Sequence, residues 1–338
     1  MKIGIVTPAP PTSRYGNRVT ALRWARILRK LGHHVSVKQR YQGEAFDLLL
    51  ALHARKSHAA IQTFHRRHPA APIVVGLTGT DVYHDIHKNS QVRVSLRLAT
   101  RLIVLQPEAI KELPSHERRK ARVIYQSVEW PKQPKTDAIT NQPHGIDAHS
   151  FRNFPASRRA HRVFNVSVIG HLRPVKDPFR AAMAARLLPN SSRIRILQVG
   201  GAMSPAMARR ARKEQTSNPR YRWLGEESCA RVRQMLSSCQ LCVLSSKLEG
   251  GANVLGETIV AGVPVLASRI PGSVGILGED YPGYFKVGAT RELARLLYRV
   301  ETDGRFLNGL RKRCRRLVPL FDPIREETAW KKLLRELT

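Results

Sequence analysis

The segment SSKLEGGANVLGETIVAGVPVLAS, residues 245–268, places Glu249 and Glu257 on either side of two adjacent glycines, Gly250 and Gly251. The apolar run at 241–244 before it predicts a buried strand, and the glycines predict a loop. Residues 253–261 then predict a helix, and residues 264–267 predict a second strand. A strand, a glycine loop, a helix and a strand in this order are typical of a parallel α/β sheet.

The same segment holds the parts of a nucleotide-sugar site. A helix N-terminus reached through glycines presents free N–H groups and a positive dipole end, which suits a diphosphate. A carboxylate inside the helix, Glu257, can accept two hydrogen bonds from the diol of a ribose, and Glu249 before the loop can hold a sugar hydroxyl. The alternative is that both glutamates are structural and lie beside an ordinary strand–helix turn.

Composition sets the outer bounds of the fold. The chain has 338 residues, 42% of them hydrophobic, which is enough for two domains of ordinary size. No stretch approaches the roughly 18 uninterrupted apolar residues of a membrane span. The N-terminus MKIGIVTPAP predicts a first strand rather than a signal peptide, so we expect a cytoplasmic protein.

Four cysteines fit a reducing compartment without a disulfide framework. Cys239 and Cys242 form a CxxC, but they lie where a helix is expected to enter a buried strand. No second CxxC or pair of histidines supplies the other ligands of a zinc site. Core packing is therefore the preferred interpretation of this motif.

The charge balance is extreme, with 58 Lys and Arg against 25 Asp and Glu, a formal net charge of +33. Such a charge favours polyanions, phosphorylated metabolites or an anionic membrane surface as partners. The arginines are spread along nearly every expected helix, and aromatic residues amount to only 6%. Solvated basic helix faces explain this pattern at least as well as nucleic-acid binding, so no nucleic acid is expected as a partner.

Strand-like and helix-like stretches alternate along the chain, which predicts two doubly wound parallel-sheet domains facing each other across a cleft. The first domain covers residues 1–130 and the second covers 163–321. Residues 131–162 are rich in proline and polar residues and predict a linker or mobile loop. The closing amphipathic stretch predicts a helix, and we expect residues 322–338 to pack back on the first domain.

The turn GHLRPVKDP, residues 170–178, follows an expected strand of the second domain. Arg173 and Lys176 in this turn would point into the cleft, where two cations could neutralise a departing nucleotide diphosphate. The alternative is that they are two of the many surface cations of this chain.

An expected helix of the first domain begins near Gly16 and Asn17, with Arg14 and Arg18 close to its start. A GxGxxG fingerprint is absent here, which argues against a dinucleotide oxidoreductase. A helix N-terminus with Asn17, Arg18 and Thr20 suits a small, highly charged oxyanion. A capped helix with solvated arginines is the alternative.

This layout, together with the segment from Glu249 to Glu257, resembles the GT-B glycosyltransferases of the large retaining family 4. The resemblance covers nearly the whole chain except the linker, and it implies a sugar transfer that needs no metal and no cofactor. It implies that Glu257 binds the ribose, that Glu249 lies near the donor sugar, and that Arg173 and Lys176 stabilise the leaving diphosphate. The same resemblance assigns the remaining donor contacts to Gly250, Gly251, Ala252, Asn253 and Val254.

Two positions depart from the pattern of that family. The family usually has an arginine directly after the glycine of the 170–178 turn, where this chain has His171. Many members read HGTD after the fourth strand, with the histidine near the reacting sugar, whereas this chain reads TGTD with Thr78 in its place and Asp81 retained. The usual role of the histidine is therefore not carried over to His84 or His87.

Several strings are similar to the selenosugar synthases of selenoneine biosynthesis, an offshoot of family 4. These strings include GNRVTALRWARIL, LLLALHARKS, LTGTDVY, GHLRPVKDPFRAA and SKLEGGANV. This resemblance implies UDP-N-acetylglucosamine or UDP-glucose as donor and selenophosphate as the nucleophile, giving a 1-seleno-sugar. The acceptor would then be bound by Gly16, Asn17, Arg18, Thr20, Thr78 and Asp81.

Two other functions remain open at this stage. One is a conventional family 4 enzyme that acts on a lipid-linked or glycan acceptor at an anionic membrane, where the basic helix faces would attach it. The other is a nucleic-acid-binding protein that has the fold of a sugar transferase but no activity.

Overall fold

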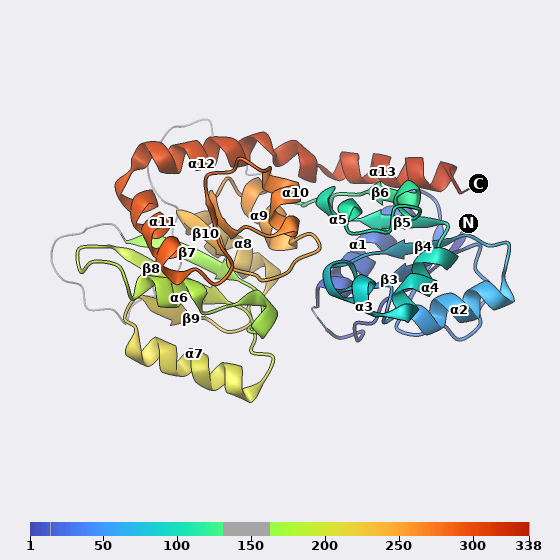
Figure 1. Cartoon of the computed structure of the whole chain (residues 1–338), viewed down its shortest axis with the longest axis horizontal. Coiled ribbons are helices and arrows are strands. Elements are labelled where there is room, and N and C mark those ends of the chain that lie inside the picture. The colour runs from blue at the N-terminus through green and yellow to red at the C-terminus, as the bar shows by residue number, and fades with distance from the viewer. Residues whose placement is uncertain (14, 131–162, 338) are drawn as a thin grey trace.

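The structure is a computed structural model that describes residues 1–13, 15–130 and 163–337. Arg14 and the predicted linker 131–162 lie outside the described residues, so the domain boundaries at 130 and 163 stay predictions. Figure 1 shows two α/β units side by side, with a helical stretch at the C-terminus running along both of them.

A six-stranded parallel sheet in the order β2-β1-β3-β4-β5-β6 forms the centre of the N-terminal domain, within its described residues. Its middle strand β3 reads LLLAL and is buried at all five positions, as expected for a strand covered by helices on both faces. The strands are β1 (Lys2–Val6), β2 (His34–Lys38), β3 (Leu48–Leu52), β4 (Ile73–Gly76), β5 (Arg101–Val104) and β6 (Ala121–Val123). The helices are α1 (Gly16–Lys30), α2 (His58–Arg67), α3 (Ile86–Lys88), α4 (Ser90–Leu98) and α5 (Glu108–Lys111), with a π-helical turn at Asp81–Asp85.

A second six-stranded parallel sheet, in the order β12-β11-β10-β7-β8-β9, forms the described C-terminal domain. The two parallel sheets confirm the predicted fold class. The strands are β7 (Phe164–Ile169), β8 (Ile194–Val199), β9 (Tyr221–Trp223), β10 (Leu241–Leu244), β11 (Val265–Ser268) and β12 (Tyr284–Phe285). The helices are α6 (Arg180–Ala185), α7 (Pro205–Ser217), α8 (Cys229–Ser238), α9 (Asn253–Val260), α10 (Pro271–Leu277), α11 (Thr290–Thr302), α12 (Gly304–Arg316) and α13 (Pro323–Arg335), with a 3₁₀ turn at Pro174–Lys176.

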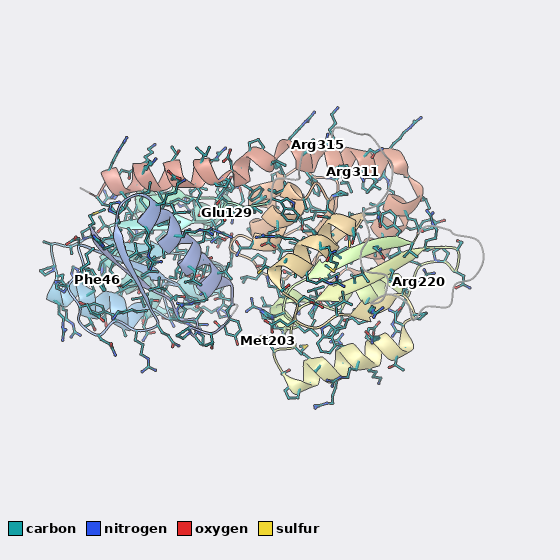
Figure 2. All side chains as sticks on the ribbon, turned by 180° about the vertical axis from the view of Figure 1, so that it is seen from behind. Phe46, Glu129, Met203, Arg220, Arg311 and Arg315 are labelled. Carbon is teal, nitrogen blue, oxygen red and sulfur yellow. The ribbon has the colours of Figure 1, made fainter. Side chains whose placement is uncertain are left out.

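The cysteines and the cations take the places expected from the sequence. Cys239 and Cys242 are buried in the C-terminal domain, and burial raises the pKa of the Cys239 thiol to about 12. Exposed cations line the outer sides of helices, and Figure 2 shows Arg311 and Arg315 on α12 at the edge of the molecule. No helix among the described residues is both long enough and apolar enough to cross a membrane.

The C-terminal helix α13 returns to the N-terminal domain. Trp330 is fully buried in the same apolar cluster as Trp24 of α1, with ring centroids 5.1 Å apart. Next to them, the buried carboxylate of Glu326 accepts hydrogen bonds from the Trp24 indole N–H at 3.0 Å and from the Ser127 backbone N–H at 2.7 Å. One carboxylate therefore joins α13, α1 and the segment after β6.

Replacing Glu326 by Ala is expected to destabilise the N-terminal domain. The substitution leaves the buried N–H groups of Trp24 and Ser127 without an acceptor, which should cost about 3 kcal/mol of unfolding free energy. Urea unfolding followed by tryptophan fluorescence measures this change. Glu327→Ala is the control, because the ion-pair partners of Glu327 within the described part of the chain are the exposed Lys30 and Lys331, and these pairs should contribute about 1 kcal/mol or less. Equal losses in the two variants would contradict the assigned role of Glu326.

Candidate functional site

The two domains meet where loops from the carboxyl ends of both sheets approach each other. A Cβ on Gly250 would lie 2.4 Å from the carbonyl oxygen of Thr78, and a Cβ on Gly251 would lie 2.6 Å from the Cβ of Leu105. Thr78 follows β4, Leu105 follows β5, and the two glycines follow β10. The loop with Gly250 and Gly251 therefore touches the N-terminal domain directly, and any side chain on these glycines would push the domains apart.

A small interdomain cavity lies beside this contact. Its volume is about 10 Å³, which is room for one water at most, and its lining includes Gln126 from the N-terminal domain and Asn253 from α9. The domains are thus closely packed at the start of α9.

Glu249 and Lys176, predicted to act together, form an ion pair in the C-terminal domain. Lys176 ends the 3₁₀ turn after β7, and Glu249 lies in the loop after β10. The Ser246 hydroxyl also donates to Glu249, at 2.6 Å, and the Lys247 N–H donates to the carbonyl of Val175 at 2.8 Å. The two turns are therefore held together by both side chains and backbone.

Two other residues of the 170–178 turn, Arg173 and His171, do not take part in this ion pair. The side chain of Arg173 is exposed and has no ion-pair partner within the described part of the chain. The ring of His171 packs edge-on against Tyr15 of the N-terminal domain, with centroids 6.1 Å apart, and its buried Nδ1 makes no hydrogen bond among the described residues. The turn that carries the predicted diphosphate cations thus faces the start of α1.

Helix α9 begins without a side-chain cap. Its N-cap residue is Ala252, so the N–H groups of the first turn, those of Asn253 and Val254 included, have no side-chain acceptor of the capping type. No acidic residue lies in this first turn. Among the described residues, the positive end of the helix dipole therefore has no side-chain cap and no acidic residue of its own first turn, which suits an anion.

Glu257 lies one turn further along α9 and is partly buried. Burial raises the pKa of its carboxyl, while the positive charges of Arg23 and Arg233 act in the opposite direction. Arg23 comes from α1 of the other domain, and its guanidinium donates to the side-chain oxygen of Asn253 at 3.2 Å. Sequence analysis missed Arg23, because its partners lie more than 200 residues away and nothing in the local pattern marks it.

The predicted acceptor residues at the start of α1 do not act as one group. Tyr15, the N-cap, provides no side-chain cap, so the first N–H groups of the helix near Gly16 and Asn17 are not capped. Arg18 is half-buried, and its Nε makes no hydrogen bond among the described residues. Thr20, in contrast, is buried and its hydroxyl accepts from the Gln126 side chain at 2.7 Å, so it braces α1.

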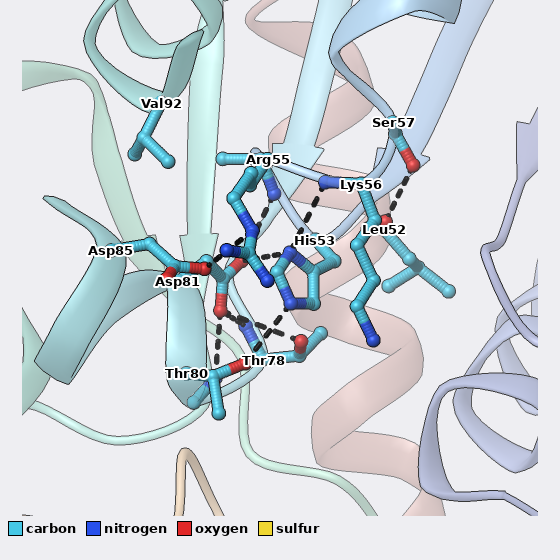
Figure 3. A network of polar contacts seen from close by, with 12 residues as sticks. Leu52, His53, Arg55, Lys56, Ser57, Thr78, Thr80, Asp81, Asp85 and Val92 are labelled. Carbon is cyan, nitrogen blue, oxygen red and sulfur yellow. Dashed lines mark hydrogen bonds and ion pairs between the residues drawn. The ribbon is translucent and has the colours of Figure 1, made fainter. Parts of the chain in front are cut away.

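Asp81 is fully buried, and its carboxylate accepts hydrogen bonds from backbone N–H groups of its own domain (Figure 3). One oxygen accepts from the N–H groups of Thr78 and Gly79, both at 2.9 Å, and the other accepts from the Ala54 N–H at 3.0 Å. Asp81 therefore shapes the TGTD loop, while the half-buried side chain of Thr78 stays at its surface.

A buried histidine, His53, belongs to the same network and was missed by sequence analysis. It follows β3 with φ of 72°, and its Nε2 lies 3.0 Å from the Thr80 hydroxyl. Nearby, Arg55 pairs with the buried Asp85 at 3.1 Å. The one sequence signal for these residues is that polar and basic side chains, in the string HARKS, directly follow an apolar strand.

Comparisons with known proteins agree with this geometry. Residues 151–317 match the family described as glycosyl transferases group 1. HepE of Anabaena, solved with UDP, superposes with a TM-score of 0.73 at 17% identity, covering 99% of this chain and 100% of its own. Sucrose-phosphate synthase of Thermosynechococcus elongatus gives 0.73 at 17% identity, covering 99% and 98%. OtsA in its apo form gives 0.70 at 10% identity, covering 100% and 99%. No curated protein matches the sequence.

Two parallel-sheet domains with these structural matches define the GT-B fold. Within this fold, residues 151–317 match the group 1 glycosyl transferases, which supports a glycosyltransferase.

Glu257→Gln is expected to stabilise the protein at neutral pH. Because folding raises the pKa of Glu257, the folded state binds the proton more tightly, and stability is lost as pH rises from the unfolded to the folded pKa. Gln removes this loss, so the variant should exceed wild type in unfolding free energy at pH 7, and the difference should shrink towards pH 4.

Denaturant unfolding at several pH values checks this expectation. Glu279→Gln serves as the control, because Glu279 is exposed and its one ion-pair partner among the described residues is Arg269. A pH-independent difference between Glu257→Gln and wild type would contradict the assigned burial effect.

Proposed function

We propose that this glycosyltransferase moves a sugar from UDP-N-acetylglucosamine or UDP-glucose to selenophosphate and forms a 1-seleno-sugar. The observation that carries the donor half is the Lys176–Glu249 pair beside the uncapped start of α9, with Glu257 one turn further. The complexes of HepE with UDP and with UDP-glucose support a uridine nucleotide as the donor.

The donor would lie along the C-terminal domain. Glu257 accepts hydrogen bonds from the ribose hydroxyls, and the N–H groups from Gly250 to Val254 contact the diphosphate and the sugar. Lys176 and Arg173 stabilise the charge that develops on UDP as it leaves. Glu249 orients the sugar, and its ion pair with Lys176 couples the position of the sugar to that of the diphosphate.

The acceptor half is supported by the resemblance to the selenosugar synthases and by Thr78 in place of the usual histidine. Selenium of selenophosphate attacks the anomeric carbon, the bond from this carbon to the diphosphate oxygen breaks, and UDP departs with the bonding electrons. Selenium is a strong nucleophile and needs little help from a general base, so the loss of the histidine is tolerated. The phosphoryl group on selenium is transferred to water later, in the site or after release.

UDP release that depends on selenophosphate is the direct test. Purified protein with either UDP-sugar is expected to release UDP only when selenophosphate is added, and mass spectrometry should detect a selenium-bearing sugar. Glu257→Ala should weaken UDP binding about 10- to 100-fold, since two hydrogen bonds to a carboxylate are lost. Glu279→Ala should leave binding unchanged. Donor binding without selenophosphate-dependent release would redirect the search to lipid-linked or glycan acceptors.

We also propose that the transfer needs no metal, because Lys176, Arg173 and the start of α9 supply the positive charge at the diphosphate. UDP release is then expected to continue at an unchanged rate in excess EDTA. A loss of activity in EDTA that Mg²⁺ or Mn²⁺ restores would contradict this part of the proposal.

A further inference from the structure

The exposed Lys56 has no side-chain partner for its charge among the residues that the structure describes. It follows β3 at the carboxyl edge of the N-terminal sheet, and within the described residues its ammonium makes no hydrogen bond or ion pair. Its neighbour Arg55 is different, because its guanidinium pairs with the buried Asp85 at 3.1 Å. Lys56 is thus a cation available for a ligand.

Lys56 lies in the network that shapes the TGTD loop. Figure 3 shows its side chain beside the His53 ring, with the ammonium directed to the same side as the hydroxyls of Thr78 and Thr80. The backbone nitrogen of Lys56 lies 3.5 Å from His53 Nδ1, so the two residues are neighbours after β3. Thr80 is exposed and Thr78 is half-buried, so this side of the network is open.

His53 holds the Thr80 hydroxyl in place. Its Nε2 lies 3.0 Å from the Thr80 oxygen, and its Nδ1 lies 3.5 Å from the Lys56 backbone nitrogen and 3.8 Å from an Asp81 carboxylate oxygen. Burial lowers the pKa of His53, which favours the neutral ring.

The negative charges around this place are already compensated. Asp81 accepts three backbone N–H groups and is fully buried, and Asp85 faces Arg55. Among the described residues around this place, the exposed Lys56 ammonium and the Thr80 hydroxyl remain open to a ligand. Both are groups that bind the oxygens of a phosphate-like anion.

The TGTD loop also faces the donor side. A Cβ on Gly79 would lie 2.9 Å from the amide nitrogen of Gly250, the residue after Glu249. An anion held beside this loop would therefore lie across the domain contact from the place assigned to the donor sugar. That is the position an acceptor must occupy.

We propose that Lys56 and Thr80 bind the oxygens of a small, free tetrahedral oxyanion acceptor, with His53 as the residue that positions the Thr80 hydroxyl. This assignment rests on the proposed function for the identity of the acceptor. It adds two binding residues at the end of β3 and β4 to a site that sequence analysis placed at the start of α1 and at Thr78 and Asp81.

Steady-state kinetics with UDP-sugar and selenophosphate test the assignment of Lys56. Lys56→Gln should raise the KM for selenophosphate about 10- to 100-fold, the effect of losing one charge-assisted hydrogen bond, with UDP affinity within about twofold of wild type. Lys88→Gln is the matched control, because Lys88 is an exposed lysine of the same domain without an ion pair among the described residues. An unchanged KM in Lys56→Gln would overturn the assignment while leaving the proposed function intact.

Thr80 offers a second, independent variant. Thr80→Val keeps the shape but removes the hydroxyl, and should raise the same KM about 10-fold, whereas Thr80→Ser should restore it. Equal KM values for the Val and Ser variants would contradict the role of the hydroxyl.

A binding experiment separates failure of the inference from failure of the proposed function. If wild type releases no UDP with selenophosphate, the proposed function fails, and calorimetric binding of thiophosphate to the UDP-saturated protein tests the oxyanion site alone. Binding that is lost in Lys56→Gln but kept in Lys88→Gln supports the site. No binding to wild type, or equal binding to all three proteins, overturns it. Lys56-dependent binding to phosphatidylglycerol vesicles in place of thiophosphate would also overturn the assignment to a small free anion.

Discussion

The backbone contact between the TGTD loop and the loop with Gly250 and Gly251 is the constraint on which the site depends. A Cβ on Gly79 or on Gly250 would lie within 3 Å of backbone atoms across the domain contact. Because both loops have glycine at this point, their backbones can come into direct contact, and any residue with a Cβ would prevent this. The contact sets the distance between the loop after β10 and the loops after β3 and β4. It therefore determines which N-terminal residues can reach the transferred sugar.

Charged groups around this contact divide into those that hold the protein together and those that remain open. Asp81, Asp85 and Glu326 are buried carboxylates whose partners lie within the N-terminal domain and α13. The negative charge of Glu257 is only partly compensated, because burial raises the pKa of its carboxyl more than the charges of Arg23 and Arg233 lower it. A carboxylate kept ionised against its own desolvation reduces stability, and a ligand that donates hydrogen bonds to it recovers that free energy.

The sequence predicted the fold well because its signal is local. Apolar strands such as 48–52 alternate with amphipathic helices, and the glycines after β10 mark the loop that contacts the N-terminal domain. Candidate site residues could be named from the sequence only where they share a short segment, as Glu249 and Glu257 do in one and Arg173 and Lys176 do in another. Arg23 bonds to a residue 230 positions away and Glu326 to one 302 positions away, and no local pattern reports such pairs. Thr20 and Asp81 carry polar groups suited to a ligand, but tertiary contacts already occupy those groups.

The same reasoning explains why a net charge of +33 could not identify the cations of the site. Arg55 and Lys56 are adjacent, both exposed and both basic, yet Arg55 pairs with a buried carboxylate and Lys56 has no ion-pair partner within the described part of the chain. A cation whose charge is matched inside the protein gains little by contacting an anionic ligand, because it would have to give up an existing partner. The residues that can bind anions are therefore found by accounting for each charge in turn. That accounting selects Arg173 on the donor side and Lys56 on the other, whereas Lys176 shares its charge with Glu249.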